Sequence, residues 1–408
     1  MQAGQHALRV VSSAIFTERL ARLEEWLWAD GFPQLGLERA PTAAELAPEV
    51  IALSDLYTTE RDAMARRRDG PNAPCHLRAK VGFFLCSDAP KVYLVLRELE
   101  QRGALPSGAG GRPLRVLDLG AGAGSTIVGL LLSLDAASVP GLTIQGVDAD
   151  QRALSIWRTA AEHAAALAGL KIHLTERPWH LEDGLEALAP RRYDWILLQS
   201  VLNELFPETT ESAQRIARCA EWLAPALAAE LTIVIEPALR EPTRILHQVR
   251  DLLLAAGGTE VLAPCLHQRA CPMLARRRDW CHERRLFAVT PNVAAVQALT
   301  RRRDQRLNFS FVVLRQLRPA PGHQLPPTAG RLVSDALHSK GKTERILCAN
   351  DGALHRLRLL KRDQTPANRL LISAPRGDLI QISSLGESDR VSSSSKIEKL
   401  QNHGRLAP

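Results

Sequence analysis

Three cysteine thiols lie within seventeen residues of one another, at Cys265, Cys271 and Cys281. The chain has only 7 cysteines in 408 residues, so this concentration requires a cause. Thiolates gather either to form disulfides or to hold a soft metal centre. The odd number of cysteines and the lack of an export signal favour reduced thiols. The sequence therefore predicts a metal-binding loop within residues 263–285.

A glycine-rich segment earlier in the chain predicts a loop that binds a cofactor. Gly120, Gly122 and Gly124 follow a short apolar run and precede a helix-forming stretch. Glycine lets the backbone approach a ligand closely, and the start of a helix favours a negative group. Asp118 precedes the glycines, and Asp148 ends the next apolar run, where a carboxylate can bind both ribose hydroxyls.

This spacing suits both S-adenosylmethionine (SAM) and NAD, and a glycine loop alone is a weak indication. The acid ahead of the glycines and the order of the elements favour SAM. We expect SAM to be the cofactor, with NAD and a degenerate pocket that binds nothing as alternatives. The residues expected to bind it are Asp118, Gly120, Gly122, Gly124 and Asp148.

Polar residues at the end of the apolar run 195–199 and just after it are candidates for positioning a methyl acceptor. Gln199, Asn203 and Glu204 lie where a parallel sheet presents its rim, although they could equally cap the next helix. The segment lacks the Asn/Asp-Pro-Pro-aromatic signature of base-amino methylation, and it has no cysteine to attack a pyrimidine. Methyl transfer needs mainly alignment of acceptor and methyl group, so a missing general base does not exclude an enzyme.

Short apolar runs alternate with helix-forming stretches from residue 113 onward. This alternation predicts an α/β fold with a doubly wound, largely parallel sheet. The order resembles the Rossmann-like sheet of class I SAM-dependent methyltransferases. The predicted strands are 114–119, 142–147, 195–199, 231–236, 260–262 and 309–314, and the predicted helices are 126–134, 151–167, 210–223, 243–256 and 292–303.

Composition predicts four parts. Residues 1–105 form a helical N-terminal region, in which Pro90 occupies a first helical turn. A linker at 106–111 opens the methyltransferase-like domain, 106–318, and prolines at 319–327 mark its end. A small basic β module follows at 319–384, and the serine-rich tail, 385–408, is predicted to be disordered. The module's basic residues are Lys340, Lys342, Arg345, Arg356, Arg358, Lys361, Arg362, Arg369 and Arg376.

A formal charge of +8 and a pI near 9.4 indicate a polyanionic partner, and arginine suits phosphate because its planar fork donates two hydrogen bonds. Arg-Arg-Arg-Asp occurs at 66–69, 276–279 and 301–304, although a GC-rich genome would also raise the arginine content. No apolar run reaches the roughly 18 residues of a membrane span. We expect a cytoplasmic protein, with the mitochondrial matrix as the alternative.

The motifs around the cysteines resemble one family, the methyltransferase-like proteins of the mitochondrial small ribosomal subunit and their bacterial relatives. The resemblance lies in Ala263–His267, Ala270–Pro272, Asp279–His282, Val201–Leu205 and Phe309–Leu314, and it extends to Ser334-Asp335, Gly341-Lys342 and Cys348. It covers about residues 50 to 380.

This resemblance implies a [4Fe–4S] cluster held by Cys265, Cys271, Cys281 and, from the C-terminal module, Cys348. It also implies action on the small ribosomal subunit, by methylation of ribosomal RNA or by assistance with assembly. Zinc is the alternative metal, with His267 or His282 as substitute ligands, although irregular gaps of five and nine residues differ from zinc knuckles. The rival functions are a non-catalytic assembly factor and a small-molecule methyltransferase with structural zinc.

Two further expectations concern the rest of the chain. Cys75, Cys86 and Cys219 lie outside the motif and are expected to be buried structural thiols. The protein is expected to be a monomer.

Overall fold

The structure is a computed structural model that describes residues 8–58, 73–106, 111–207, 209, 211–300, 306–317 and 328–400. Several sequence features lie outside these residues: most of the linker at 106–111, the proline-rich boundary at 319–327, and two of the Arg-Arg-Arg-Asp repeats, 66–69 and 301–304. The side chain of Cys75 is also outside the described part.

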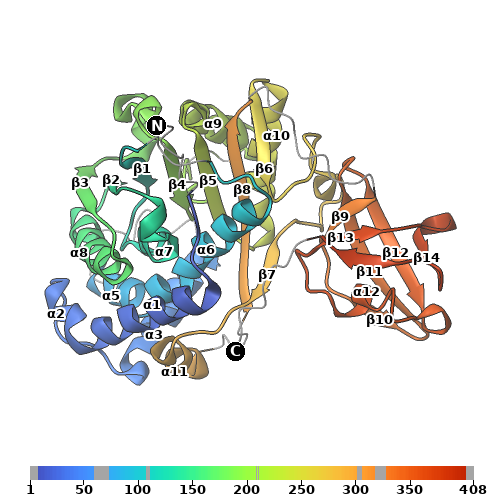
Figure 1. Ribbon diagram of the computed structural model, residues 1–408. Coiled ribbons are helices and arrows are strands. Elements are labelled where there is room, and N and C mark those ends of the chain that lie inside the picture. Colours follow the sequence, from blue (N-terminus) through green and yellow to red (C-terminus); the bar gives the residue numbers. More distant parts are fainter. Residues whose placement is uncertain are drawn as a thin grey trace, which may run out of the picture.

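Within the described residues, eight strands form the larger sheet (Figure 1), in the order β3-β2-β1-β4-β5-β8-β6, with β7 pairing with β8. Strands β1 to β5 run parallel, and β8 runs antiparallel to β5, β6 and β7. This is the strand order of class I methyltransferases, so the predicted α/β class is confirmed. The strands are β1 (Leu114–Leu119), β2 (Leu142–Asp148), β3 (Ile172–Pro178), β4 (Trp195–Gln199), β5 (Leu231–Pro237), β6 (Thr259–Ala263), β7 (Glu283–Leu286) and β8 (Arg306–Gln316).

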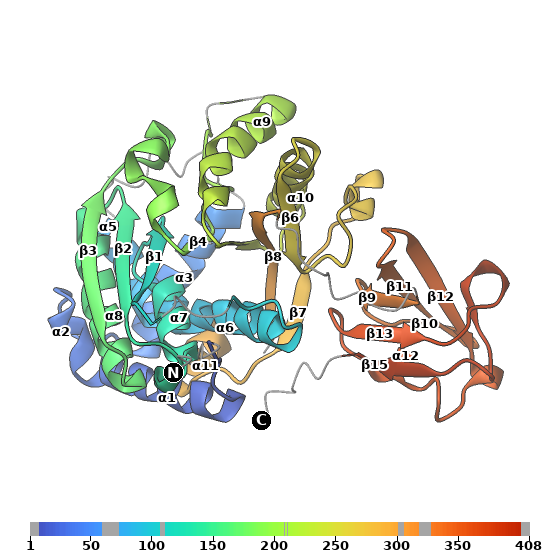
Figure 2. The ribbon, with the colours of Figure 1, turned by 45° about the horizontal axis from the view of Figure 1, so that its top comes forward.

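Helices cover both faces of this sheet, because successive side chains of a strand point to opposite sides. On β5, Ile233 and Ile235 belong to a core that includes α6 (Leu85–Gln101), α7 (Ser125–Ser133) and α8 (Gln151–Ala168). Val234 belongs to the opposite core, under α9 (Ser212–Leu223) and α10 (Arg240–Ala255). Figure 2 shows the sheet between these two layers.

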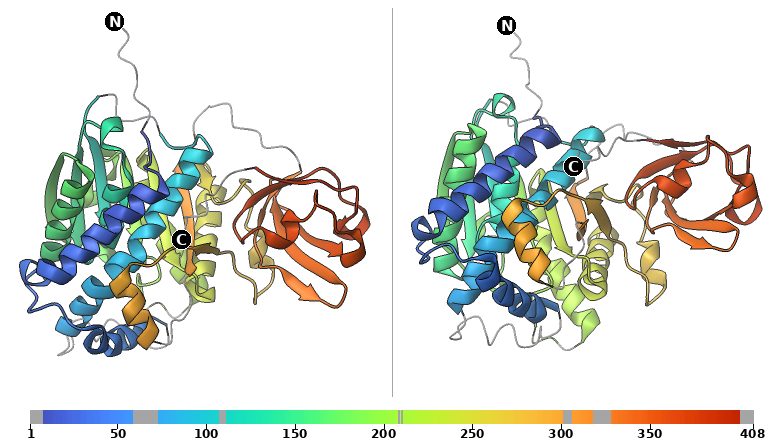
Figure 3. Two further views of the ribbon diagram at one scale, coloured as in Figure 1. Left: turned by 60° about the horizontal axis from the view of Figure 1, so that its bottom comes forward. Right: turned by 90° about the horizontal axis from the view of Figure 1, so that it is seen from below.

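The N-terminal region is helical as predicted: α1 (Ser13–Trp26), α2 (Phe32–Gln34), α3 (Ala43–Thr58), α5 (Ala73–Ala79) and α6. Figure 3 shows α1 and α6 side by side across the larger domain. The expectation for Pro90 is wrong, because the proline lies inside α6, which begins at Leu85. A π-helical turn, Lys80–Phe84, leads directly into this helix.

One carboxylate of α1 caps a helix far along the chain. Glu24 accepts hydrogen bonds from the backbone N–H of Asn292 (2.9 Å) and Val293 (3.0 Å) and from the hydroxyl of Thr290. These donors lie at the start of α11 (Pro291–Leu299). A negative charge at a helix N-terminus is favourable, so these contacts offset the free-energy cost of burying the Glu24 side chain.

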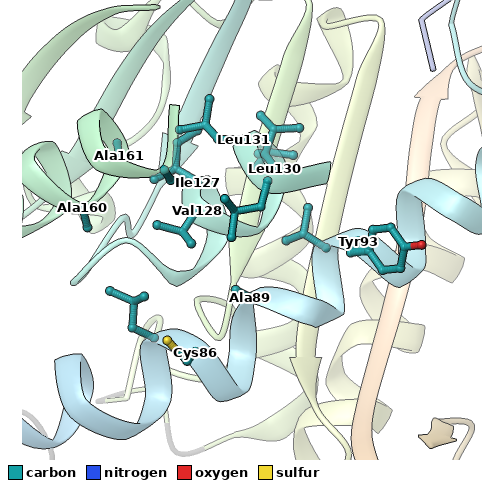
Figure 4. Close-up of a cluster of buried hydrophobic side chains, with 14 of the residues drawn as sticks. Cys86, Ala89, Tyr93, Ile127, Val128, Leu130, Leu131, Ala160 and Ala161 are labelled. Carbon is teal, nitrogen blue, oxygen red and sulfur yellow. The ribbon is translucent and has the colours of Figure 1, made fainter. Parts of the chain in front are cut away.

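Helices α6 and α7 pack closely against each other. Figure 4 shows Ala89 of α6 and Val128 of α7 in the buried cluster where the two helices meet. Gly129 makes this approach possible, because a Cβ there would overlap with the carbonyl oxygen of Ala89. Cys86 is buried in the same core, as expected, and Cys219 is buried in the core under α9.

The C-terminal module is a second sheet, ordered β14-β12-β11-β9-β13-β15, with β10 pairing with β11. Leu332, Leu357 and Ile380 lie in its core. Its elements are β9 (Ala329–Leu332), β10 (Leu337–Ser339), β11 (Lys342–Ala349), β12 (Leu354–Leu360), α12 (Leu370–Ser373), β13 (Leu379–Ile382), β14 (Arg390–Val391) and β15 (Ile397–Lys399).

The prediction of a disordered tail from residue 385 is wrong for residues 385–400. β14 pairs with β12, and β15 pairs with β13, so Val391 and Ile397 enter the core of the module. The serine run forms a turn in which the buried Ser395 donates to the carbonyl of Ser384 (3.0 Å). Residues 401–408 lie outside the described part.

No helix in the described residues is long and apolar enough to cross a membrane.

Replacement of Gly129 by alanine should destabilise the protein by about 1–3 kcal/mol, because the added methyl group forces α6 away from α7. Helix propensity alone predicts the opposite, a gain of about 1 kcal/mol. Denaturant unfolding measures the difference. The exposed Ser155→Ala on α8 is the control and should be within about 0.5 kcal/mol of the wild type. A Gly129→Ala variant of wild-type stability would contradict the contact.

Candidate functional site

A cavity of ≈ 1430 Å³ opens at the carboxyl ends of β1, β2, β4 and β5. Ligands of doubly wound sheets bind in this position. Its lining includes the glycine loop after β1, the acids after β2, the segment after β4 and part of α6. The lining residues used below are Gly120, Gly122, Ser125, Asp148, Gln199, Val201, Asn203, Glu204 and His282.

The glycine loop has the backbone conformation that its sequence predicts. Gly120, Gly122 and Gly124 have φ angles of 65°, 49° and 100°, which residues with a side chain rarely adopt. A Cβ at Gly120 would lie 2.6 Å from Cγ2 of Val201, so the loop after β4 packs directly on the glycine loop. Helix α7 begins at Ser125, so its free N–H groups point towards this end of the cavity.

Asp148 is fixed by two backbone groups. Its Oδ2 accepts from the N–H of Gly122 (2.9 Å), and its Oδ1 accepts from the N–H of Asp150 (3.0 Å). Each carboxylate oxygen retains acceptor capacity, and the residue lines the cavity. The arrangement fits an adenosyl ligand: Asp148 would accept from the ribose hydroxyls, and Gly120 and Gly122 would lie along the ligand.

Asp118 lies beneath the cavity rather than in its lining. It is fully buried, and its Oδ2 accepts from Nε1 of Trp157 (2.9 Å). Its Oδ1 has no partner among the described residues. The pKa of Asp118 is raised to about 7. Burial is the main cause, the hydrogen bond from Trp157 opposes the shift, and the negative charge of Asp148 adds to it. Gly124 is also absent from the lining. Of the predicted cofactor residues, Gly120, Gly122 and Asp148 therefore line the cavity, whereas Asp118 and Gly124 do not.

Trp157 supports the loop from below. A Cβ at Gly146 would lie 2.7 Å from its indole ring, and a Cβ at Gly124 would lie 3.4 Å from its Cα. The tryptophan on α8 therefore explains the glycine at position 146, whereas Gly124 is required by its φ angle. Sequence analysis missed this residue because a buried tryptophan on a helix carries no separate signal.

Gln199, Asn203 and Glu204 all line the cavity. The alternative that they cap the next helix is wrong, because α9 begins at Ser212 and Glu211 occupies its N-cap position. Gln199 donates from Nε2 to Oγ of Ser125 (3.3 Å), and its Oε1 is buried without a partner among the described residues.

Three of the four predicted metal-ligating thiols come together. Cys271 and Cys281 share a small buried cluster with Met273 and Val333, and Cys348 of β11 packs against it. Cys348 Sγ lies 3.5 Å from Nε2 of His267. Among the described His, Cys, Asp and Glu side chains there is no group of three or more that could hold a metal ion.

Cys265 interacts electrostatically with the other three thiols, although it packs against the core under α9 and α10. Burial raises the pKa of Cys271, and the charges of Cys281 and Cys265 raise it as well. Burial, followed by Cys265, raises the pKa of Cys281 to about 12. Burial, followed by Cys265 and Cys281, also raises the pKa of Cys348. Cys271, Cys281 and Cys348 therefore stay protonated at neutral pH without a metal, and metal binding there would release protons.

Thiolates are ligands for zinc and for iron–sulfur clusters alike. The donor chemistry of these cysteines therefore fits both of the metal centres expected from the sequence.

Arginines bind the backbone of the cysteine loop. Arg244 of α10 donates to the carbonyls of Leu274 (3.1 Å) and Asp279 (2.8 Å). Arg250 donates to the carbonyls of His267 (3.1 Å) and Arg269 (2.7 Å). This loop has little secondary structure of its own, so these bonds give it a defined path.

A buried ion-pair network joins the loop to the rest of the protein. Arg331 of β9 contacts Glu98 of α6 and Glu283 of β7 (3.3 Å), and its Nε donates to the carbonyl of Pro264 (2.9 Å). Arg285 of β7 pairs with Glu283 (2.6 Å). The side chains of Arg331, Glu98 and Glu283 are each 3% exposed, so the network is dry.

The thiol cluster and the cavity share a segment of chain. Cys281 belongs to the cluster, while the adjacent His282 lines the cavity and stacks on Trp280 at 5.6 Å. Trp280 in turn donates from Nε1 to the carbonyl of Ala238 (2.9 Å), just beyond β5.

Comparison with known proteins supplies a family. The sequence model of the mitochondrial small ribosomal subunit family Rsm22 matches residues 90–380. No curated protein matches the chain.

The protein is also similar to solved methyltransferase structures. The delta-N METTL16 methyltransferase domain has 13% identity and a TM-score of 0.31, over 55% of this chain and 82% of that one. A human methyltransferase 10 domain containing protein has 17% identity and a TM-score of 0.28, over 42% and 76%. The CurJ carbon methyltransferase has 13% identity and a TM-score of 0.30, over 75% and 93%. The fold assignment itself rests on the strand order.

Replacement of Asp118 by asparagine should stabilise the protein increasingly as the pH rises from about 4 to 7. The folded-state pKa of about 7 lies above the ordinary value of 3.8, so the carboxyl favours folding at low pH and loses this contribution as the pH rises. Asparagine does not ionise and can still accept from Trp157. The expected gain at pH 8 is on the order of 3 kcal/mol.

Thermal unfolding of both proteins between pH 4 and 8 measures this gain. The exposed Asp183→Asn is the control, for which no pH-dependent gain is expected. A difference between Asp118→Asn and wild type that does not change with pH would contradict the buried, unpaired carboxyl.

Proposed function

Because this chain belongs to the family of the mitochondrial small ribosomal subunit protein Rsm22, we propose that it binds SAM and acts on the small ribosomal subunit, either by methylating its RNA or by assisting its assembly. The observation that carries the proposal is the cavity at the strand ends, with the glycine loop and Asp148 in its lining. When bound, SAM would supply the methyl group. The chain's own residues bind the adenosyl part and orient the acceptor.

We propose that Cys265, Cys271, Cys281 and Cys348 hold a [4Fe–4S] cluster. The packing of Cys348 of β11 against the buried Cys271 and Cys281 of the cysteine loop supports this assignment. Arg250, Arg331 and Arg376 lie close enough to lower the pKa of individual thiols, so positive charge surrounds the donor set. The cluster would then fasten the C-terminal module to the cysteine loop.

The C-terminal module is the proposed RNA contact. Five of its basic residues are exposed: Lys340, Arg356, Lys361, Arg362 and Arg369. Two that the sequence assigns to this surface are instead buried. Arg345 donates to the carbonyl of Ala374 (2.8 Å), and Arg376 donates to the carbonyl of His282 (2.8 Å), so both stabilise the fold.

The family's description names the mitochondrial small ribosomal subunit. This description supports the mitochondrial matrix, which is the alternative compartment expected from the sequence, as the location of the protein. A monomer remains the proposed state.

Purified protein should bind SAM and transfer labelled methyl to small-subunit RNA or its precursors. Asp148→Ala should weaken SAM binding by roughly 10- to 100-fold, because a charged acceptor of the ribose is lost. Calorimetry measures the affinity. Glu162→Ala, which removes an exposed acid from α8, is the matched control and should bind SAM like the wild type.

Two outcomes separate the alternatives. SAM binding without transfer, together with impaired subunit maturation in cells carrying Asp148→Ala, would indicate an assembly factor. A protein that binds no SAM, with normal maturation in that variant, would refute the proposal.

Anaerobically purified protein should be brown and contain about four irons per chain. Cys271→Ser should lose most of this iron and become more sensitive to proteolysis beyond residue 320, because the clamp to the C-terminal module is broken. Cys219→Ser is the matched control, since this buried thiol lies outside the cluster. One zinc and no iron per chain would refute the cluster and support the structural-zinc alternative.

A further inference from the structure

The loop between β4 and α9 is held in an unfavourable backbone conformation. Ser200 and Phe206 have φ angles of 61° and 55°, a region that costs residues with side chains on the order of 1–3 kcal/mol each. Such conformations persist only where the surroundings impose them, and they concentrate at functional sites. The loop lies between these two residues and includes Asn203.

Two residues hold this conformation from opposite sides. Glu236, at the end of β5, is fully buried, and its Oε1 accepts from the N–H of Val201 (3.0 Å) and Leu202 (2.8 Å). Arg215 of α9 donates to the carbonyls of Asn203 (2.8 Å) and Leu205 (2.9 Å). Burial raises the pKa of Glu236 to about 8, whereas the hydrogen bonds from the loop lower it, so the loop and this buried carboxyl group stabilise each other.

Glu236 also fixes the orientation of the Asn203 side chain. The amide group of Asn203 lies 2.9 Å from Oε2 of Glu236 and 3.0 Å from the carbonyl of Ser200. The carbonyl of Ser200 can only accept, so the amide nitrogen faces this side and donates one hydrogen to Ser200 and one to Oε2 of Glu236. The amide oxygen is then the only side-chain atom with which Asn203 can bind a ligand.

Gln199 offers a second acceptor to the same cavity. Its nitrogen is directed to Ser125, and its Oε1 is buried with no partner among the described residues. Gln199 is 8% exposed and Asn203 is 7% exposed. A buried acceptor without a donor is unusual in a folded protein and indicates that a ligand supplies the donor.

The position of these acceptors relates them to the cofactor. Val201 packs on Gly120, so the loop that holds Asn203 touches the glycine loop. Ser125, which binds Gln199, begins α7 at the end of that glycine loop. The two amides therefore lie in the cavity beside the loop that is proposed to bind the cofactor.

We propose that Gln199 and Asn203 form a subsite for the exocyclic amino group of a nucleobase, and that Glu236 is the positioning residue that turns the Asn203 oxygen into it. An amino group carries two hydrogens for two acceptors, whereas a hydroxyl carries one and a base carbonyl carries none. The choice of a nucleobase rests on the proposed function, which supplies RNA as the substrate.

The test uses two nucleotides that differ at this group, cytidine monophosphate (CMP) with an amino group and uridine monophosphate (UMP) with a carbonyl. Ligand-observed NMR measures their affinities for the full-length protein saturated with S-adenosylhomocysteine. The wild type should bind CMP about 3- to 10-fold more tightly than UMP, as expected for one or two hydrogen bonds.

Glu236→Gln should abolish or invert this preference. The new side chain keeps one oxygen for the N–H groups of Val201 and Leu202, but it presents an amide nitrogen to Asn203. Asn203 must then turn its oxygen towards that nitrogen and direct its own nitrogen into the cavity. Asn203→Leu should bind both nucleotides equally, and Glu162→Gln, on the exposed face of α8, should keep the wild-type ratio.

Thermal unfolding and S-adenosylhomocysteine affinity show which variants are folded, and Asn203→Leu tests the subsite if Glu236→Gln does not fold. Equal binding of CMP and UMP by the wild type, or binding of neither, would overturn the proposal. A folded Glu236→Gln variant with the wild-type ratio would overturn the role of Glu236.

These outcomes are separate from the test of the proposed function. A preference for CMP without methyl transfer to small-subunit RNA would leave the subsite standing and refute the methylation. Methyl transfer together with equal binding of CMP and UMP would support the methylation and refute the subsite.

Discussion

The charges buried around Arg331 determine how the parts of this protein are joined. Arg331 comes from the first strand of the C-terminal module, Glu98 from the long N-terminal helix α6, and Glu283 from the strand that follows the cysteine loop. Each is stable in a dry interior only while its partners are present, and removal of one partner of such a group typically costs about 3–5 kcal/mol. The three regions therefore depend on one another, although they are separated by up to 233 residues.

The same elements form both candidate sites. Helix α6 contributes Lys91 to the lining of the cavity and Glu98 to the buried network, two turns apart. Strand β8 pairs with β5 at the cavity and with β7 beyond the cysteine loop, and its Ser310 donates to the carbonyl of Cys281 (3.1 Å). The cavity and the thiols are therefore neighbouring parts of one rigid framework rather than sites on independent domains.

Much of this framework could be predicted from the sequence, because β1, β4 and β5 are buried on both faces and appear as continuous apolar runs. Strand β3 was missed because only Leu174 of its seven residues is buried. Strand β7, Glu-Arg-Arg-Leu, resembles an exposed loop, and only its partners across the network explain why its charges are buried. The spacing of the cysteines identified three thiols, but Asp118 and Glu236 show that an acid at a strand end can lie beneath a site as easily as in it. Burial beneath a site is a property of packing that local sequence does not encode.

The cap that Glu24 provides for α11 has a consequence for the order of folding. During synthesis N-terminal segments emerge first and generally fold first. The donors that compensate the buried charge of Glu24 are Thr290, Asn292 and Val293, which are made more than 260 residues later. Helix α1 therefore cannot reach its final environment while the chain is still short. The buried charge of Glu24 gains its hydrogen-bond donors only after residues 290–293 have been made.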